Sequence, residues 1–462
     1  MFYKNNFSKL IIYAIPGILG GFFSLVTVIL FVNYLTSDIY ANFLLQHLVI
    51  TVGISVLSLY IGRITLININ NLSPIKKKEV IYNSLILMSV ICFILSLITY
   101  IFLIMFIKNI NLFDVTISVF VGLFFSSIYQ NMEDMAKGLA LDKVASMSNL
   151  MFMNLSVTIP AFLLAIYNTE FIKSNLFNIS VSIKILTTLF ILMVIITTQK
   201  IRISKFDISF FLKFKIQNLF LSIYGILDQF YYALDKYLIK NSLSSFQLVT
   251  YSLSQQISSK IGIISYACSS LMFNKILKNR NNKKDILSGN VYFCFYFCSF
   301  CYLLVLPFFD ALLSILLKDK FNNEISNSLK LFILVNIISA VKDCIDGFLR
   351  TILKLEKDLK FSVSILPFYL FGILICIYSK NLTYFILLLL LKEVCMLFLK
   401  IKLTREFLIN HLIFVMQILI LNIIIILNLF FNYKELYLAL YIIFFITAYI
   451  NFNRSVIKKY FF

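Results

Sequence analysis

Four polar side chains lie on one face of an apolar segment near the middle of the chain. Asp228, Tyr231, Tyr232 and Asp235 are spaced i, i+3, i+4 and i+7, which places them along one side of a helix. The segment around them, from about residue 216 to 238, is long enough to cross a bilayer. A charge at the centre of a bilayer costs roughly 2.5–3.5 kcal/mol, and such residues persist where they contact water or a partner. The stripe therefore predicts a polar path through a helical bundle.

A second apolar segment, from about residue 248 to 273, follows after a short polar turn and contains Lys260 near its middle. Gln256 and Ser259 precede the lysine on the same segment. We expect Lys260 to be a cation that meets an anionic substrate. The alternative is that Lys260 pairs with Asp228 only to hold two helices together.

A third polar face lies on the segment from about residue 329 to 351, where Lys342, Asp343 and Asp346 share about 120° of the helix surface with other polar residues. Lys342 and Asp346 are spaced i, i+4 and could neutralise each other locally. The face predicts a helix that lines a wet cavity. The candidate ion-coupling residues are Asp228, Asp235, Asp343 and Asp346.

Other charged residues in apolar segments have two interpretations. Arg63 and Lys184 either contact cargo or, as long side chains do, extend to the membrane surface. Lys392 and Glu393 are adjacent and point about 100° apart, so structural pairing and function are both open. His47 is expected to be a packing residue. The predicted substrate-binding residues are Lys260, Arg63, Lys184, Lys342, Gln256, Ser259, Tyr231 and Tyr232.

The composition is that of a membrane protein. The chain has 462 residues, of which 61% are hydrophobic and 13% charged, and soluble proteins carry about 25% charged residues. The first apolar run is too long for a signal peptide and lacks a small-x-small cleavage site. We expect an all-α polytopic membrane protein. The predicted spans cover about residues 10–34, 42–67, 80–107, 112–129, 148–167, 176–198, 216–238, 248–273, 291–309, 329–351, 361–378, 382–399, 408–430 and 436–450.

The net charge of +20 does not indicate a nucleic-acid partner, because the basic residues gather in short loops on one side. With fourteen spans, that side holds about 27 Lys and Arg and the other about 8. This asymmetry places both termini in the cytoplasm. No extramembrane segment exceeds about 20 residues, so no soluble catalytic domain is expected and the chain is not predicted to be an enzyme.

Cysteine usage predicts no metal site. The eight Cys lie in apolar segments and form no CxxC motif. Cys294, Cys298 and Cys301 share a helical face, but no His or carboxylate lies near them in the sequence, so we interpret them as packing residues. No cofactor is predicted.

The chain divides at a basic loop, and weak internal similarity suggests a repeat. Tyr34-Leu35 followed by Phe43 is similar to Tyr237-Leu238 followed by Phe246. An even number of spans separates these turns, which predicts a parallel repeat. The expected organisation is a six-helix bundle over 1–199, a cytoplasmic linker over 200–215, a second six-helix bundle over 216–402 and two further transmembrane helices over 403–462.

Several motifs resemble one transporter family. They are Leu234-Asp235-Lys236-Tyr237-Leu238-Ile239 with Tyr251-Ser252 after it, Gly347-Phe348-Leu349-Arg350 with Lys354, Lys357 and Lys360 after it, Ile15-Pro16-Gly17, and Leu35-Thr36-Ser37-Asp38-Ile39-Tyr40. With the fourteen spans, they resemble Wzx-type polysaccharide (O-antigen or capsule repeat-unit) flippases of the multidrug/oligosaccharidyl-lipid/polysaccharide (MOP) exporter superfamily. The resemblance covers the whole chain, mostly as pattern. The chain departs from it at Ala41, where Gly is usual, and at Phe273-Asn274-Lys275, where Pro is common.

The resemblance implies a MATE-like fold in the bacterial inner membrane and a flippase for a polyprenyl-pyrophosphate-linked oligosaccharide. Membrane lipids are expected partners, and the polysaccharide polymerase and chain-length regulator are left open. Energy would come from an H⁺ or Na⁺ gradient or from consumption of the product. A MATE-like drug antiporter is one alternative, although the acidic residues that branch has in its first helix are absent. A lipid II flippase is another, although its Arg-Gly clusters are absent. A membrane glycosyltransferase would need a long outer loop.

Overall fold

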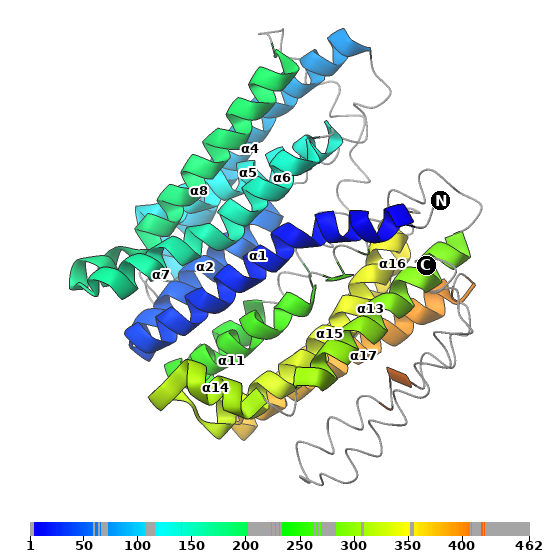
Figure 1. Cartoon of the computed structure of the whole chain (residues 1–462). Coiled ribbons are helices and arrows are strands. Elements are labelled where there is room, and N and C mark those ends of the chain that lie inside the picture. Colours follow the sequence, from blue (N-terminus) through cyan, green and yellow to red (C-terminus); the bar gives the residue numbers. More distant parts are fainter. Residues whose placement is uncertain are drawn as a thin grey trace. The chain divides into compact units, whose positions relative to one another are not determined.

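A computed structural model describes most of the chain, and every element to which it gives bounds is helical (Figure 1). The described residues are 4–58, 61–62, 65, 73–107, 116–139, 141–201, 223, 227, 231, 233–262, 264–265, 268, 283–305, 309–351, 355–406, 408, 417–418 and 420. The predicted all-α architecture is confirmed. The chain forms two compact units, one of Phe22–Val249 and one of Met1–Gly21 with Thr250–Phe462. We call them the N-terminal and C-terminal units.

The predicted domain boundaries stay a prediction, because nearly all of the expected linker over 200–215 and most of the expected last two helices lie outside the described residues.

The N-terminal unit is built from long apolar helices with polar caps. Thr36 accepts a hydrogen bond from the Ile39 amide at the start of one helix, and Thr169 accepts from Ile172 at the start of another. An acidic residue follows each cap and favours the helix start. The helices are α1 (Lys4–Tyr34), α2 (Ser37–Leu57), α4 (Pro74–Ile107), α5 (Ile117–Gly138), α6 (Asp142–Asn149), α7 (Ser156–Tyr167) and α8 (Glu170–Gln199). The residues of α1 from Phe22 onward belong to this unit.

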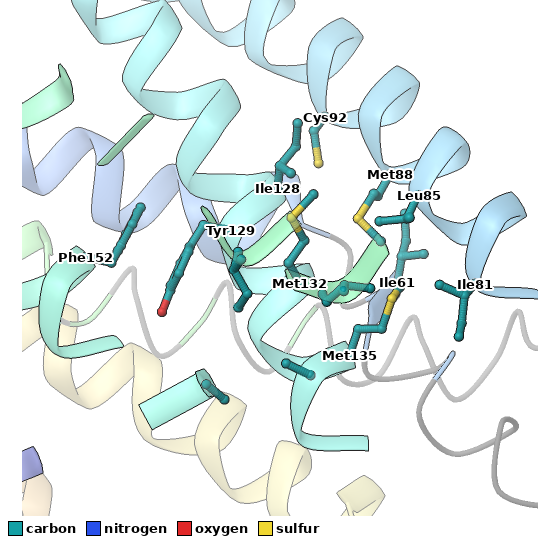
Figure 2. Close-up of a cluster of buried hydrophobic side chains, with 14 of the residues drawn as sticks. Ile61, Ile81, Leu85, Met88, Cys92, Ile128, Tyr129, Met132, Met135 and Phe152 are labelled. Atoms are coloured by element: carbon teal, nitrogen blue, oxygen red, sulfur yellow. The ribbon is translucent and has the colours of Figure 1, made fainter. Parts of the chain in front are cut away.

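The core of the N-terminal unit lies between α4, α5 and α8, with the residues after α2 (Figure 2). Asn131 of α5 joins two of these elements. Its side-chain oxygen accepts from the Gly62 amide at 2.9 Å, and its amide nitrogen donates to the Ser58 carbonyl at 2.9 Å. A Cβ on Gly62 would lie 1.9 Å from the Asn131 carbonyl oxygen. Only glycine fits at this crossing.

The C-terminal unit contains the part of α11 (Ser245–Ser258) from Thr250 onward and a set of helices that follow it. Those are α13 (Lys283–Val305), α14 (Phe309–Leu317), α15 (Asn323–Thr351), α16 (Leu355–Ser379) and α17 (Leu382–Thr404). Tyr251 of α11 packs edge-on against Phe332 of α15, with ring centroids 4.7 Å apart. Asn381 caps α17 by accepting from the Thr383 amide at 2.8 Å.

Contacts between helices give their relative directions. In the N-terminal unit Ser118 contacts Asn178 and Thr188 contacts the carbonyl of Phe125, so α5 and α8 run parallel. In the C-terminal unit the later part of α13 contacts the earlier part of α15, through the Tyr302 hydroxyl and the Lys330 carbonyl. These directions agree with the alternation of spans expected from the sequence.

Five segments among the described residues are long and apolar enough to cross a membrane. They are Lys76–Met105, Met147–Tyr167, Glu170–Gln199, Leu359–Ser379 and Leu382–Thr404. Their outer faces carry large exposed apolar side chains, such as Ile98 and Phe102 of α4 and Phe371 of α16. Such faces suit contact with lipid.

The structure corrects several predicted boundaries. Glu133 and Asp134, expected in a loop, lie within α5. The helix expected over 148–167 includes a π-helical stretch, Leu150–Leu155, and α14 forms where a loop was expected. The helix expected to run unbroken from 248 to 273 changes after Ser258 into a 3₁₀ turn, Ser259–Ile261.

Candidate functional site

The 3₁₀ turn that interrupts the helix at Ser259–Ile261 carries the lysine at the centre of our prediction. Lys260 lies in this turn, and its side chain is partly buried. Ser259 beside it is exposed, and Gln256, one turn earlier, is partly exposed. No atom of the other described residues lies within 4 Å of the position that a Cβ on Gly262 would occupy, the adjoining helix backbone aside. The side of this turn that carries Gly262 is therefore open toward the described residues.

A hydrogen bond between helices holds the start of this turn in place. Asn336 of α15 donates to the Ser258 hydroxyl at 2.8 Å, and Ser258 in turn donates to the Ser254 carbonyl at 2.6 Å. Lys260 has no carboxylate partner among the described residues, and its charge is balanced by no neighbouring group there. When protonated, Lys260 would stabilise an anion placed beside it.

Other predicted charges of the C-terminal unit pair across two helices. The Lys342 ammonium of α15 lies 2.8 Å from a carboxylate oxygen of Glu393 on α17. Asp346, one turn further along α15, pairs with Lys400 of α17. Lys342 and Asp346, which the sequence suggested could neutralise each other locally, thus each have an ion-pair partner on α17. Two pairs in ascending order on both helices show that α15 and α17 run parallel.

Glu393 is shared between two lysines. Its other carboxylate oxygen lies 3.0 Å from Lys392, and the Lys392 ammonium lies 5.4 Å from the Tyr369 ring centroid on α16. Lys342 also lies 3.9 Å from Asp343, which is half-exposed. These contacts hold α15, α16 and α17 together. The substrate role predicted for Lys342 and the ion-coupling roles predicted for Asp343 and Asp346 stay predictions.

Tyr231, predicted to bind substrate, and Asp235, predicted to couple an ion, lie on the segment before α11 and are buried. Both belong to the N-terminal unit. Asp235 is 2% exposed and Tyr231 is 5% exposed. An Asp235 carboxylate oxygen accepts from the Lys236 amide at 2.8 Å. Further along the same helix, Lys240 contacts Ser245 and lies 3.8 Å from Asp38 of α2. Arg63, Asp228 and Tyr232 lie outside the described side chains.

Lys184 of α8 is 5% exposed, and its ammonium lies 5.1 Å from the centroid of the Phe152 ring. His47 of α2 lies nearby, between the rings of Phe43 and Phe177, with its Nε2 3.1 Å from the Ser180 hydroxyl. The packing role expected for His47 agrees with these contacts. Lys184 is more deeply buried than a lysine that extends to the membrane surface.

Sequence reasoning missed Lys400 and the aromatic pair of Tyr129 and Phe152. Lys400 lay beyond the predicted end of its helix at residue 399, although Glu393 and Lys400 are spaced i, i+7 on one face. Nothing in the sequence indicated that Phe152 would lie on a π-helical stretch. Among the described residues, no group of three or more His, Cys, Asp or Glu could hold a metal ion.

No family model matches the chain, and no curated protein matches its sequence. Solved structures do match. Lipid II flippase MurJ in an inward closed conformation covers 95% of this chain and 97% of its own, with a TM-score of 0.68 at 14% identity. An inward-facing multidrug resistance MATE family transporter of the MOP superfamily has a TM-score of 0.62 at 13% identity, and covers 88% of this chain and 99% of its own.

The fold is that of MurJ and the MATE transporters. A MOP superfamily transporter from Pyrococcus furiosus also shares it, with a TM-score of 0.58, 13% identity and coverage of 90% of this chain and 96% of its own. The MATE-like fold expected from the sequence is therefore confirmed. With its apolar helices, the MurJ/MATE fold makes this chain a multi-pass membrane protein.

Proposed function

We propose that the chain is a flippase that moves a polyprenyl-pyrophosphate-linked oligosaccharide repeat unit across the bacterial cytoplasmic membrane for surface polysaccharide synthesis. It works by alternating access, with both termini in the cytoplasm. The observation that carries the proposal is Lys260, which lies on the turn that interrupts its helix and has no carboxylate partner among the described residues. A pyrophosphate that leaves water loses hydration, and a nearby cation replaces it.

The residues around Lys260 suit the rest of such a cargo. Gln256 and Ser259 offer hydrogen-bonding groups to sugar hydroxyls at the same turn. The interruption of the helix also fits a transporter, because broken helices form binding sites where they line a cavity. Likeness to a protein named as a lipid II flippase supports a lipid-linked substrate.

A lipid II flippase is the second candidate, favoured by the TM-score of 0.68 to MurJ. Rescue of a MurJ-depleted strain by this chain would favour lipid II. Restoration of surface polysaccharide in a strain that lacks this gene, without such rescue, would favour the repeat unit. A drug antiporter would instead move cationic drugs in proteoliposomes and restore neither phenotype.

The test of the proposed site is a series at Lys260 in a strain that lacks the chromosomal gene. Lys260→Arg keeps the charge and should retain part of the surface polysaccharide. Lys260→Ala should lose most of the surface polysaccharide. The lipid-linked repeat unit should accumulate in the inner leaflet, and the protein level should be normal. Lys402→Ala, on an exposed lysine at the end of α17, is the matched control. Normal polysaccharide in Lys260→Ala would overturn the proposal.

A double change distinguishes substrate binding from a structural ion pair with Asp228. If Asp228→Ala combined with Lys260→Ala restores both protein level and transport, the two residues were only a structural pair. If the protein level is normal and transport stays lost, Lys260 acts on the cargo.

A further inference from the structure

Lys184 is a buried cation for which the N-terminal unit supplies no counter-ion. It is 5% exposed, and its ammonium has no carboxylate partner among the described residues. Its contact is the face of the Phe152 ring, 5.1 Å away. A contact with a ring face replaces only part of the hydration that an ammonium loses on burial. Burial therefore disfavours the charged form of Lys184 while this packing persists.

The groups that face Lys184 from neighbouring helices do not offset that cost. From α2 comes His47, whose positive charge would repel that of Lys184. From α5 come Tyr129, whose hydroxyl is 3.2 Å from Ser148, and Glu133, which accepts from Asn149 at 3.0 Å. Within α8, Glu170 pairs with Lys173, more than two turns before Lys184.

The parallel register of α5 and α8 separates the backbones of Glu133 and Lys184 along the helix axis. A Cβ on Gly122 would touch Val181, so residues near 122 lie level with the turn that precedes Lys184. Glu133 is 11 residues further along α5, so its backbone lies about 16 Å further along the axis at 1.5 Å per residue. The described residues of α7 and of the π-helical stretch add no charged side chain at this level.

The aromatic residue under Lys184 sits on irregular backbone. Phe152 lies in the π-helical stretch Leu150–Leu155, a form of helix that is rare and frequent at functional sites. Its ring stacks on Tyr129 with centroids 3.9 Å apart and an interplanar angle of 3° (Figure 2). The stack closes one side of Lys184 to water. Any movement of α5 or α7 that separates the stack from α8 would admit water to the amine.

We propose that Lys184 is a proton-binding site of the N-terminal unit. The amine holds its proton less tightly while α2, α5, α7 and α8 are packed as in this structure, and its nitrogen lone pair binds a proton from water more tightly when these helices part. Repacking returns the proton to water. The site rests on the proposed function, since alternating access supplies the opening. It adds a lysine to the carboxylates predicted for ion coupling.

The experiment uses purified full-length protein in lipid nanodiscs, in a background with the native cysteines replaced. Thr187→Cys places a thiol on the buried side of α8 near Lys184, and Thr198→Cys places one at an exposed position of the same helix. The rate of reaction with a charged, water-soluble thiol reagent is measured from pH 5.5 to 9. Dividing the first rate by the second removes the intrinsic pH dependence of thiols.

The relative rate at position 187 should be high at low pH and fall by up to about tenfold per pH unit through the titration of Lys184. Lys184→Met should give a low, flat profile. Lys184→Arg keeps its charge at every pH tested and should give a high, flat profile. His47→Gln should keep the pH dependence. A flat profile in the otherwise native protein overturns the proposal without any variant.

Persistence of the pH dependence in Lys184→Met, or its loss in His47→Gln alone, would also overturn the proposal, and the second result would assign the proton to His47. Lys184→Gln replaces Lys184→Met if the latter does not give a monodisperse protein. Because the assay contains no cargo, its failure leaves the flippase proposal untouched. That proposal stands or falls on the Lys260 series.

Discussion

Lys342 of α15 and Glu393 of α17 form a buried ion pair, with a nitrogen–oxygen distance of 2.8 Å and side chains 10% and 6% exposed. A second pair, between Asp346 and Lys400, joins the same two helices, with the Lys400 side chain fully buried. Charges in this setting are stable only together, since removal of one leaves the other without a counter-ion.

Lys400→Met should therefore destabilise the protein more than Asp346→Asn combined with Lys400→Met. The single change leaves a buried carboxylate and should cost about 3–5 kcal/mol, which would lower the midpoint of thermal unfolding in detergent. Lys402→Met, an exposed neighbour, is the control. Equal midpoints for the Lys400 single and double variants would show that the pair does not contribute to stability.

Gly62→Ala should destabilise the N-terminal unit by about 1–3 kcal/mol, the usual range for overpacking. The new methyl group would lie 1.9 Å from the backbone oxygen of Asn131, and backbone cannot move aside as a side chain can. Gly262→Ala is the matched control, because its new methyl group would meet no atom of the other described residues within 4 Å, the adjoining helix backbone aside. Thermal unfolding of both variants decides the matter, and a similar loss in both would contradict the close crossing.

Asp310 gives the segment between α13 and α15 a dependence on acid. Burial raises the pKa of this carboxyl, but hydrogen bonds from Ser326 and Lys330 and the charge of Lys330 outweigh it, so the pKa lies below its usual value. The folded state therefore gains stability above the unfolded-state pKa and loses it as pH falls below about 4.

Asp310→Asn should make the unfolding midpoint less sensitive to pH in this range than it is in the unmodified protein. Thermal unfolding between pH 3 and pH 6 measures the difference. An Asp310→Asn profile that coincides with that of the unmodified protein would contradict the role of the Ser326 and Lys330 contacts.

Cysteines at Gln256, Ser339 and Asp343 should react with a water-soluble thiol reagent in a background that lacks the native cysteines. All three positions are at least partly exposed within the C-terminal unit, whereas Ile338 is 1% exposed and serves as the protected control. Mass spectrometry of the labelled protein gives the extent of reaction. Protection of all three positions to the level of Ile338→Cys would contradict the predicted polar path.

Reporter fusions test the predicted topology, which follows from the positive-inside asymmetry. Fusions after Lys205 and Lys284 should report the cytoplasm, and fusions after Ser244 and Lys320 the opposite side. An inverted signal at any one of these four positions would mean that a span was miscounted.

The fold was predictable because long apolar runs separated by basic loops permit little besides transmembrane helices. The partners of individual charges were not. Lys342 and Asp346 satisfy the i, i+4 rule, yet each contacts a residue about 50 positions away on α17. A rule for neighbours within one helix cannot weigh a partner brought close by tertiary packing.

The break in the helix at Lys260 could not be predicted from the sequence either. Ser258, Ser259 and Gly262 weaken a helix only slightly, and the decisive contact is the hydrogen bond to Ser258 from Asn336, 78 residues away in sequence. Lys260 itself could be selected from the sequence, because a lysine in an apolar run stands out whatever the backbone does, and its role stays a prediction.

The order of charges on α15 and α17 favours one alignment of the two helices along their length. Lys342 precedes Asp346 on one helix and Glu393 precedes Lys400 on the other, so opposite signs face each other in one alignment. Sliding α17 until Lys400 reached Lys342 would place like charges together in a medium that screens them poorly. We therefore expect α15 and α17 to move together in the proposed transport cycle. Bending within this unit is expected at less constrained places, of which the interrupted helix at Lys260 is one.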